Sequence, residues 1–211
     1  MATTSPGASK PRRIRGLDAE QRRAQRREQI LDAALELFAT RGYLNTPIEL
    51  LCQTAFVSTK SFYEVFASRE ECALELFEDT SARFRTQLAS ALAVSAEDEN
   101  AARRLLTTFI ALLAEDPRRA SITFGLAGTD FPGFERVRQS NRRWAADAVE
   151  ALWIRNGKAG DLSRRAIAVV GGIFDVIGRW LTDTDLTGTG DAAKLVDDLS
   201  AFYAAVTDSL D

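Results

Sequence analysis

Apolar residues recur at helical spacing along nearly the whole chain, and this periodicity limits the fold more than any other feature. Between Gln29 and Phe38, apolar side chains fall on one helix face at intervals of three and four residues. Sustained alternation with a period of two residues, which would indicate strands, is missing. The sequence therefore predicts an all-α fold with about nine helices.

Polar and glycine residues divide the first third of the chain into short helices. Gly42 stands where a helix C-terminus favours a residue that adopts positive φ. Thr46 is expected to cap the next helix, over residues 46–54, and Ser58 the one after it, over residues 58–65. Three such helices bury little surface individually, so they must pack as one compact unit.

Later in the chain the predicted helices are longer. A capping box that starts at Ser68 opens a long amphipathic helix. Asp116 and Pro117 are expected to stop a helix, because proline cannot continue one. The later helices are expected at about 95–115, 122–126, 134–155, 162–181 and 192–209.

The core of the trihelical unit follows from the same spacing, and it leaves one short helix largely exposed. The predicted core consists of Ile30, Ala34, Leu37, Phe38, Ile48, Leu51, Val57, Phe62 and Phe66. The residues left outward are Thr59, Lys60, Ser61, Tyr63 and Glu64. Hydroxyls, a cation and a phenol on one short helix suit contacts with a DNA groove and its phosphates. A helical hairpin with a solvated face is the simpler alternative.

Charge is distributed unevenly along the chain. The first 69 residues hold 11 basic and 7 acidic side chains, whereas the remaining 142 hold 16 and 23. A basic front end on an acidic chain suggests a small module that meets a polyanion. The composition of residues 1–16 predicts a disordered tail, and Arg12, Arg13 and Arg15 are expected to reach the DNA backbone or minor groove.

A run of motifs within the trihelical unit resembles a known family. Its residues are Gln29-Ile30-Leu31-Asp32-Ala33-Ala34, Leu37-Phe38, Gly42-Tyr43, Thr46 and Ala55-Phe56-Val57-Ser58-Thr59-Lys60-Ser61-Phe62-Tyr63-Glu64-Val65-Phe66. Their order and spacing are similar to the DNA-binding domain of TetR-type transcriptional regulators. The resemblance implies a basic arm over residues 1–21, a helix-turn-helix domain over 22–69, and a helical regulatory and dimerisation domain over 70–211.

The sequence departs from the family pattern at two positions. Phe56 occupies a turn position where the family usually has glycine, and Lys60 stands where another glycine is common. A residue other than glycine at positive φ costs on the order of 1 kcal/mol. Lys60 adds a cation on the side expected to face DNA.

The resemblance also implies how the protein acts. We expect a ligand-responsive repressor that binds a palindromic operator on double-stranded DNA as a homodimer, through helices 162–181 and 192–209. Two-fold symmetry would set the reading helices about 34–36 Å apart. The expected DNA contacts are Thr46, Ser58, Thr59, Lys60, Ser61, Tyr63 and Arg69.

A small organic effector is expected to bind within the regulatory domain and release the DNA. Aromatic residues from successive helices, with an occasional polar group, match the composition of a ligand cavity. The candidates are Phe109, Leu112, Phe124, Phe131, Phe134, Asn141, Trp144 and Phe174. The same set equally describes an ordinary packed core.

Several other classes of protein are disfavoured by the composition. The chain has no histidine, which removes histidine-based catalysis and most zinc sites. Cys52 and Cys72 fall on apolar helix faces and are expected to be core residues. We therefore expect no enzyme, cofactor or metal, and a soluble cytoplasmic protein without membrane segments. A helical protein-interaction module that does not bind DNA is the remaining alternative.

Overall fold

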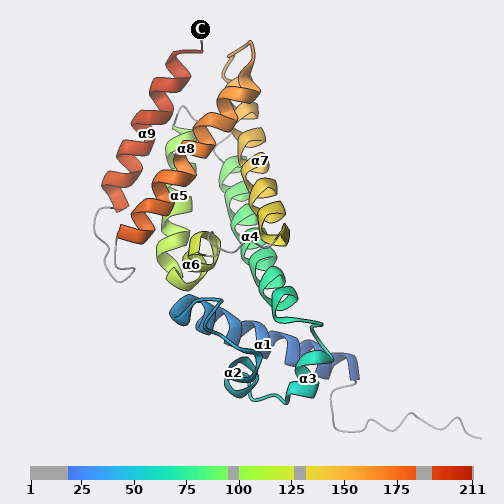
Figure 1. The fold of residues 1–211 in the computed structure, drawn as a ribbon. Helices are drawn as coiled ribbons and strands as arrows, with labels where there is room; N and C mark the ends of the chain where they lie inside the picture. The colour runs from blue at the N-terminus through green and yellow to red at the C-terminus, as the bar shows by residue number, and fades with distance from the viewer. Residues whose placement is uncertain (1–18, 95–99, 126–131, 184–191, 211) are drawn as a thin grey trace, which may run out of the picture.

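The computed structural model describes residues 19–94, 100–125, 132–183 and 192–210, and this part of the chain contains helices and turns only. The all-α prediction is confirmed, with nine helices in the described residues (Figure 1). They are α1 (Ala19–Arg41), α2 (Ile48–Thr54), α3 (Thr59–Tyr63), α4 (Arg69–Val94), α5 (Ala101–Glu115), α6 (Pro117–Gly125), α7 (Pro132–Arg155), α8 (Leu162–Asp183) and α9 (Ala192–Asp208).

The helices form two groups at opposite ends of an elongated molecule. Figure 1 shows α1, α2 and α3 at one end and α5, α7, α8 and α9 at the other. Helix α4 runs between the two groups, and α6 lies close to α1. Two helices, α4 and α6, therefore connect the two groups.

A first buried cluster holds α1, α2 and α3 together and extends into the start of α4. All nine predicted core residues belong to it: seven are buried, and Ile48 and Val57 are partly buried against the others. Leu76 and Phe77 of α4 join the same cluster. Ile122 of α6 also belongs to this cluster, so a helix from the later part of the chain packs directly on the trihelical unit.

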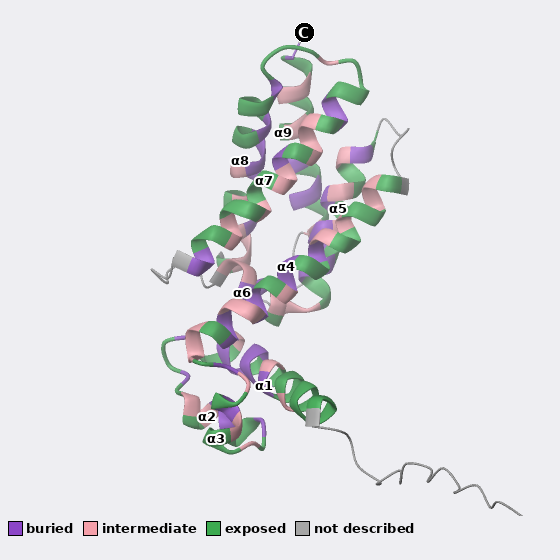
Figure 2. Ribbon diagram, turned by 90° about the vertical axis from the view of Figure 1, so that its right-hand side faces the viewer, coloured by how far each residue is buried: buried purple, intermediate pink, exposed green. Residues whose placement is uncertain are grey.

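A second cluster fills the other end of the molecule. The outer half of α4 contributes Phe84, and α5, α7, α8 and α9 supply most of the remaining buried residues (Figure 2). Trp153 is completely buried there, and its indole N–H donates to the Thr207 hydroxyl oxygen at 3.0 Å. This bond ties α7 to α9 and satisfies a polar group that would be costly to bury alone.

Local capping signals were mostly predicted correctly. Gly42 ends α1 with a φ of 79°, and its N–H donates to the Phe38 carbonyl. The Ser58 hydroxyl oxygen accepts from the Ser61 N–H at 3.0 Å, and the Ser68 hydroxyl oxygen accepts from the Glu71 N–H at 3.1 Å. The two serine contacts satisfy N–H groups of the first helical turn that have no partner within the helix.

Thr46 does not cap α2, contrary to the prediction. Its hydroxyl donates to the Gly42 carbonyl at 2.9 Å, and its side chain is fully buried. Pro47 takes the N-cap position without any side-chain cap. Thr46 therefore closes the turn between α1 and α2.

Two helix boundaries also differ from the prediction. Helix α1 begins at Ala19, so residues 19–21 of the expected disordered arm are helical. Pro117 starts α6 and does not merely stop the helix before it. Proline fits the first helical position, and the Asp116 carboxylate accepts from the Arg118 N–H at 3.2 Å. None of the described helices is long and apolar enough to cross a membrane.

Candidate DNA-binding surface and ligand cavity

The exposed side of α3 and its N-cap forms the first candidate site. We name Ser58, Thr59, Lys60, Ser61 and Tyr63 the reading surface. Ser61 is half-buried, whereas the other four residues are exposed. The buried side of α3 is anchored by Phe62, which is 0% exposed. Because the core fixes one side of this short helix, the other side is presented rigidly to solvent.

Helix α1 holds α3 in place from the side. The Arg26 guanidinium donates to the Glu64 carboxylate at 2.9 Å and approaches the Ser61 hydroxyl at 3.5 Å. Both contacts join residues more than thirty positions apart in the sequence. The positive charge of Arg26 compensates the negative charge of Glu64 beside the reading surface. The Glu64 charge would otherwise repel phosphates.

The turn before α3 takes a left-handed backbone conformation at Phe56. Phe56 has a φ of 55°, and its side chain is 95% exposed. The Val57 N–H donates to the Cys52 carbonyl, which keeps the turn closed. The turn is therefore closed with a left-handed residue other than glycine, and the strain is borne by the backbone of Phe56.

Thr46 and Arg69 occupy places that differ from the simple expectation of free DNA contacts. Thr46 is buried, so we remove its side chain from the expected contact set. Arg69 donates to the Thr46 carbonyl at 2.9 Å, and its guanidinium lies 4.3 Å from the centre of the Tyr43 ring. The Tyr43 hydroxyl in turn donates to Glu70 at 2.9 Å. Arg69 thus joins α2 to α4 while remaining partly exposed.

Burial and the hydrogen bond to Glu70 raise the pKa of Tyr43 above its usual value. The pKa of Glu70 is lowered by hydrogen bonds from the backbone and from Tyr43. This carboxylate is therefore ionised, and the phenol neutral, at neutral pH. The arm residues Arg12, Arg13 and Arg15 lie outside the described residues.

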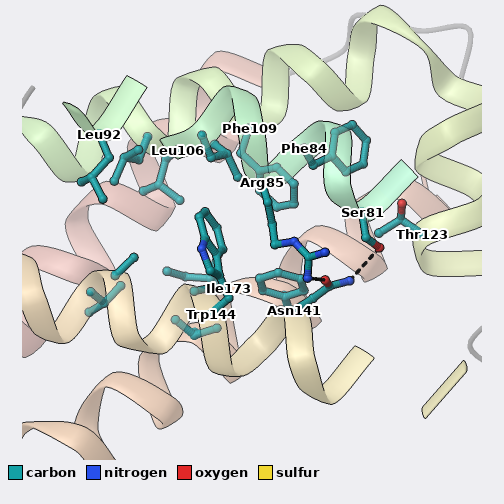
Figure 3. A pocket seen from close by; sticks show the side chains of 17 residues that line it. Ser81, Phe84, Arg85, Leu92, Leu106, Phe109, Thr123, Asn141, Trp144 and Ile173 are labelled. Carbon is teal, nitrogen blue, oxygen red and sulfur yellow. Dashed lines mark hydrogen bonds between the residues drawn. The ribbon is translucent and has the colours of Figure 1, made fainter. Parts of the chain in front are cut away.

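A largely apolar cavity between α4, α5, α7 and α8 forms the second candidate site (Figure 3). We name it the central cavity. Its wall is formed by Ser81, Phe84, Arg85, Leu88, Leu92, Leu105, Leu106, Phe109, Thr123, Asn141, Trp144, Ala145, Ala148, Val149, Val170, Ile173 and Phe174. The cavity holds about 130 Å³ of open space. A dry cavity of about 150 Å³ accepts benzene, so a small organic molecule fits here.

Four of the predicted ligand-binding residues line the central cavity. They are Phe109, Asn141, Trp144 and Phe174, which come from α5, α7 and α8. Aromatic contacts connect part of this set, since the rings of Phe109 and Phe174 lie 5.7 Å apart. Three aromatic residues and one amide of the predicted set therefore line the same cavity.

The other four candidates lie elsewhere. Phe134 is fully buried against Tyr43 and Phe77 in the first cluster, so its assignment to the ligand cavity was wrong. Leu112 packs in the second cluster without lining the central cavity. Phe124 borders a neighbouring opening instead, and Phe131 lies outside the described residues.

Sequence analysis missed the polar residues of the cavity wall. Arg85 points from α4 toward Asn141 and donates to the Asn141 amide oxygen at 3.1 Å (Figure 3). The Asn141 amide N–H₂ donates to the Ser81 hydroxyl oxygen at 2.8 Å. A charged residue on a helix is ordinarily solvated, so the one-dimensional pattern gave no reason to place Arg85 inside.

Helices α8 and α9 carry exposed apolar residues. Ile167 and Val176 of α8 and Phe202 of α9 are 60%, 44% and 42% exposed, respectively. A side chain at Gly171 would meet nothing within 4 Å, so this part of α8 is open. The surface at Gly178 is not open, because the Phe124 ring would lie 3.2 Å from a Cβ there. The close approach at Gly178 is therefore made within the chain.

Both cysteines are buried, as expected for core residues. Burial raises the pKa of the Cys72 thiol to about 12, and it also raises the pKa of Cys52. The Cys72 thiol is therefore protonated at neutral pH, which makes it a poor nucleophile.

The trihelical unit matches a family model described as bacterial regulatory proteins of the tetR family, over residues 30–76. That segment contains all of α2 and α3, much of α1 and the start of α4. Residues 30–76 therefore resemble the DNA-binding domain of TetR-family regulators. The helix-turn-helix of the TetR family is thus formed here by α2, the Phe56 turn and α3.

A curated TetR-type relative supports the same assignment. The HTH-type transcriptional regulator TcmR of Streptomyces glaucescens is 40% identical over 60 residues. The match covers 28% of this chain and about a quarter, 26%, of the length of TcmR. It therefore concerns a segment of domain size and does not extend to the remainder of either protein.

Solved structures extend the likeness in fold to most of the chain. A protein assigned to the TetR family from Mesorhizobium loti has a TM-score of 0.71 at 18% identity, covering 89% of this chain and 98% of its own. The fatty acid degradation regulator FadR from Bacillus halodurans has a TM-score of 0.67 at 20% identity, covering 82% and 94%. At such identities the likeness shows a shared fold.

Proposed function

We propose that this protein is a TetR-family transcriptional repressor that binds a palindromic operator as a homodimer and is released by a small organic molecule. The observation that carries the proposal is the rigid reading surface on α3. Its residues combine one cation, hydroxyl groups and a phenol, and these groups suit phosphates and base edges. The division into domains at residues 21/22 and 69/70 is part of this proposal.

The DNA contacts follow from the exposure of the individual side chains. Thr59, Lys60 and Tyr63 point outward and are assigned to the major groove, with Ser61 beside them. Ser58 is exposed and caps α3 through its hydroxyl, so it lies at the N-terminus of that helix. Arg69 remains partly exposed while it contacts Thr46, and it is assigned to a phosphate at the edge of the site.

The homodimer is assigned to α8 and α9. Ile167, the exposed part of Phe202 and the open surface at Gly171 supply apolar area for this contact. Pairing of these helices across a two-fold axis would bury that area and present two reading surfaces to one DNA molecule. The expected contact regions remain residues 162–181 and 192–209.

Release by a ligand requires a physical link between the central cavity and the reading surface. Helix α4 provides one link, because Phe77 lies in the first cluster and Phe84 in the second. Helix α6 provides another, because Thr123 lines the cavity while its neighbour Ile122 packs against α1 and its partners. A ligand that favours one arrangement of these helices would change operator affinity.

Selection from randomised DNA followed by gel-shift titration tests the function. We expect a palindromic site, bound more weakly by a Lys60→Ala variant. If Lys60 contacts a phosphate, the slope of log affinity against log salt falls by about one. Arg143→Ala is the matched control, because Arg143 is exposed on α7 at the other end of the molecule and should leave the slope unchanged.

Two results would contradict the proposal. Failure to enrich any DNA sequence would favour the alternative of a helical protein-interaction module. Equal affinities and salt slopes for the wild-type protein and Lys60→Ala would remove Lys60 from the DNA-contact surface.

A further inference from the structure

The wall of the central cavity is apolar except at one end. Ser81, Arg85, Thr123 and Asn141 are its polar residues, and Arg85 is its only charged member. We propose that the cavity takes a small apolar carboxylate whose anionic group binds Arg85 beside Asn141. This inference rests on the proposed function, in which the cavity receives an organic effector, and it specifies the chemistry of that effector.

Hydrogen bonds fix the position of Arg85. Its Nη1 donates to the Asn141 amide oxygen at 3.1 Å, and the Asn141 nitrogen donates to the Ser81 hydroxyl oxygen at 2.8 Å. Ser81 is 2% exposed, so this chain of contacts starts from a buried anchor. The guanidinium therefore lies against Asn141, at the polar end of the cavity wall (Figure 3).

Arg85 forms no direct ion pair with a described residue, although Glu75, Glu78 and Asp79 line an outer opening together with it. No described carboxylate lies within 4 Å of its guanidinium. The nearby Asp79 is engaged by Arg83 at 3.0 Å and by Arg119 at 3.5 Å, and Glu75 is paired with Arg27. A neutral amide oxygen satisfies one of the five N–H donors of Arg85.

A carboxylate suits this environment better than a neutral polar group. The guanidinium presents two parallel N–H groups that match both oxygens of a carboxylate. Low polarity around the pair strengthens their attraction relative to that in water. Aliphatic and aromatic side chains, including Phe109 and Trp144, surround the remaining space and favour an apolar body.

A second opening next to the cavity supports the same choice of charge. It shares Thr123, Asn141 and Phe174 with the cavity wall, and with Arg138 paired to Glu135 at 3.1 Å it carries two further arginines against a single carboxylate. The charged residues are Arg138, Arg142, Arg179 and Asp175. An excess of positive charge at an entrance concentrates anions there.

Direct binding measurements on the full-length protein test the inference. The probes are benzoate and pentanoate, whose apolar parts are no larger than benzene, each compared by calorimetry with its neutral amide of nearly the same shape. We expect each carboxylate to bind at least about tenfold more tightly than its amide. In Arg85→Gln the two members of a pair should bind within about twofold of each other. Arg83→Gln is the matched control on the same helix, and it should keep the wild-type preference.

The comparison within the wild-type protein does not depend on the folding of any variant. Amides that bind as tightly as the carboxylates would overturn the inference, and so would a lack of binding by all four probes. Retention of the preference in folded Arg85→Gln would assign it to another cation.

Operator titration in the presence of each probe separates this inference from the proposed function. Binding of a carboxylate at Arg85 without any effect on operator affinity would refute ligand release but leave the site intact. Release by amides alone would refute the carboxylate and keep the function.

Discussion

Phe56 is the only residue other than glycine with positive φ among those that the structure describes. Left-handed backbone brings Cβ too close to the following carbonyl oxygen, which costs about 1 kcal/mol. The Phe56 side chain is 95% exposed, so no packing within the chain offsets this cost. The strain is therefore a net loss to the stability of the helix-turn-helix.

Replacement of Phe56 by glycine should raise the free energy of unfolding by about 0.5–1 kcal/mol, because glycine adopts this φ without strain. Urea denaturation followed by circular dichroism measures the change. The control is Phe56→Ala, which removes the ring but keeps Cβ and should remain close to the wild-type protein. Equal stabilisation by alanine and glycine would show that the ring, and not the backbone, is responsible.

Individual site residues could be predicted where an apolar side chain at helical spacing indicated a buried helix face. Aromatic residues with helical spacing, such as Phe109 and Trp144, had to face inward, and they line the central cavity. Phe134 follows the same rule but faces the other cluster, because periodicity identifies a buried face without identifying its neighbour. Arg85 could not be found this way, since its position depends on Asn141, 56 residues later.

Helix α6, like α4, contacts both the trihelical unit and the central cavity. Ile122 is 1% exposed within the first cluster, and Arg118 reaches Glu36 of α1 at 3.3 Å. The salt bridge is exposed and contributes little to stability. The buried side chain of Ile122 is therefore the stronger mechanical link between α6 and the trihelical unit.

An Ile122→Val variant should weaken the link between the cavity and the DNA. It removes one buried methylene and should lower the free energy of unfolding by about 1 kcal/mol. Ile110→Val in α5 is the matched control, because Ile110 is 2% exposed in the second cluster. Operator titration with and without a bound ligand should show a smaller ligand effect for Ile122→Val only. Equal ligand effects in the two variants would exclude Ile122 as the link.

The helices themselves were predictable because their signals are local. Ser58, Ser68 and Gly42 each mark a boundary through contacts within four residues. The prediction failed at Thr46 and at Pro117, where two local readings compete. A threonine hydroxyl either accepts from the next helix or donates to the previous one, and a proline either stops a helix or starts one. In this structure the Thr46 hydroxyl donates to the Gly42 carbonyl, and the Asp116 carboxylate caps the helix that Pro117 starts.

At the scale of the whole molecule, the exposed apolar residues of α8 and α9 form the proposed dimer interface. Ile167 on α8 and Ile154 on α7 are 60% and 58% exposed, which makes them a matched pair. Ile167→Glu should give a monomer at micromolar concentration, because a two-fold interface would bury two unpaired carboxylates. Ile154→Glu should remain a dimer in sedimentation velocity experiments. A wild-type monomer, or a dimer in both variants, would contradict the assigned interface.

An empty central cavity would also affect how fast the proposed regulator is degraded when no ligand is bound. Unfilled apolar space lowers stability by about 24 cal/mol per Å³, which gives at most about 3 kcal/mol for 130 Å³. A ligand that binds only the folded state restores stability according to its concentration and affinity. Proteases attack the transiently opened chain, so the empty regulator would be degraded faster than the occupied one. Occupancy of the cavity would then set the amount of regulator as well as its activity.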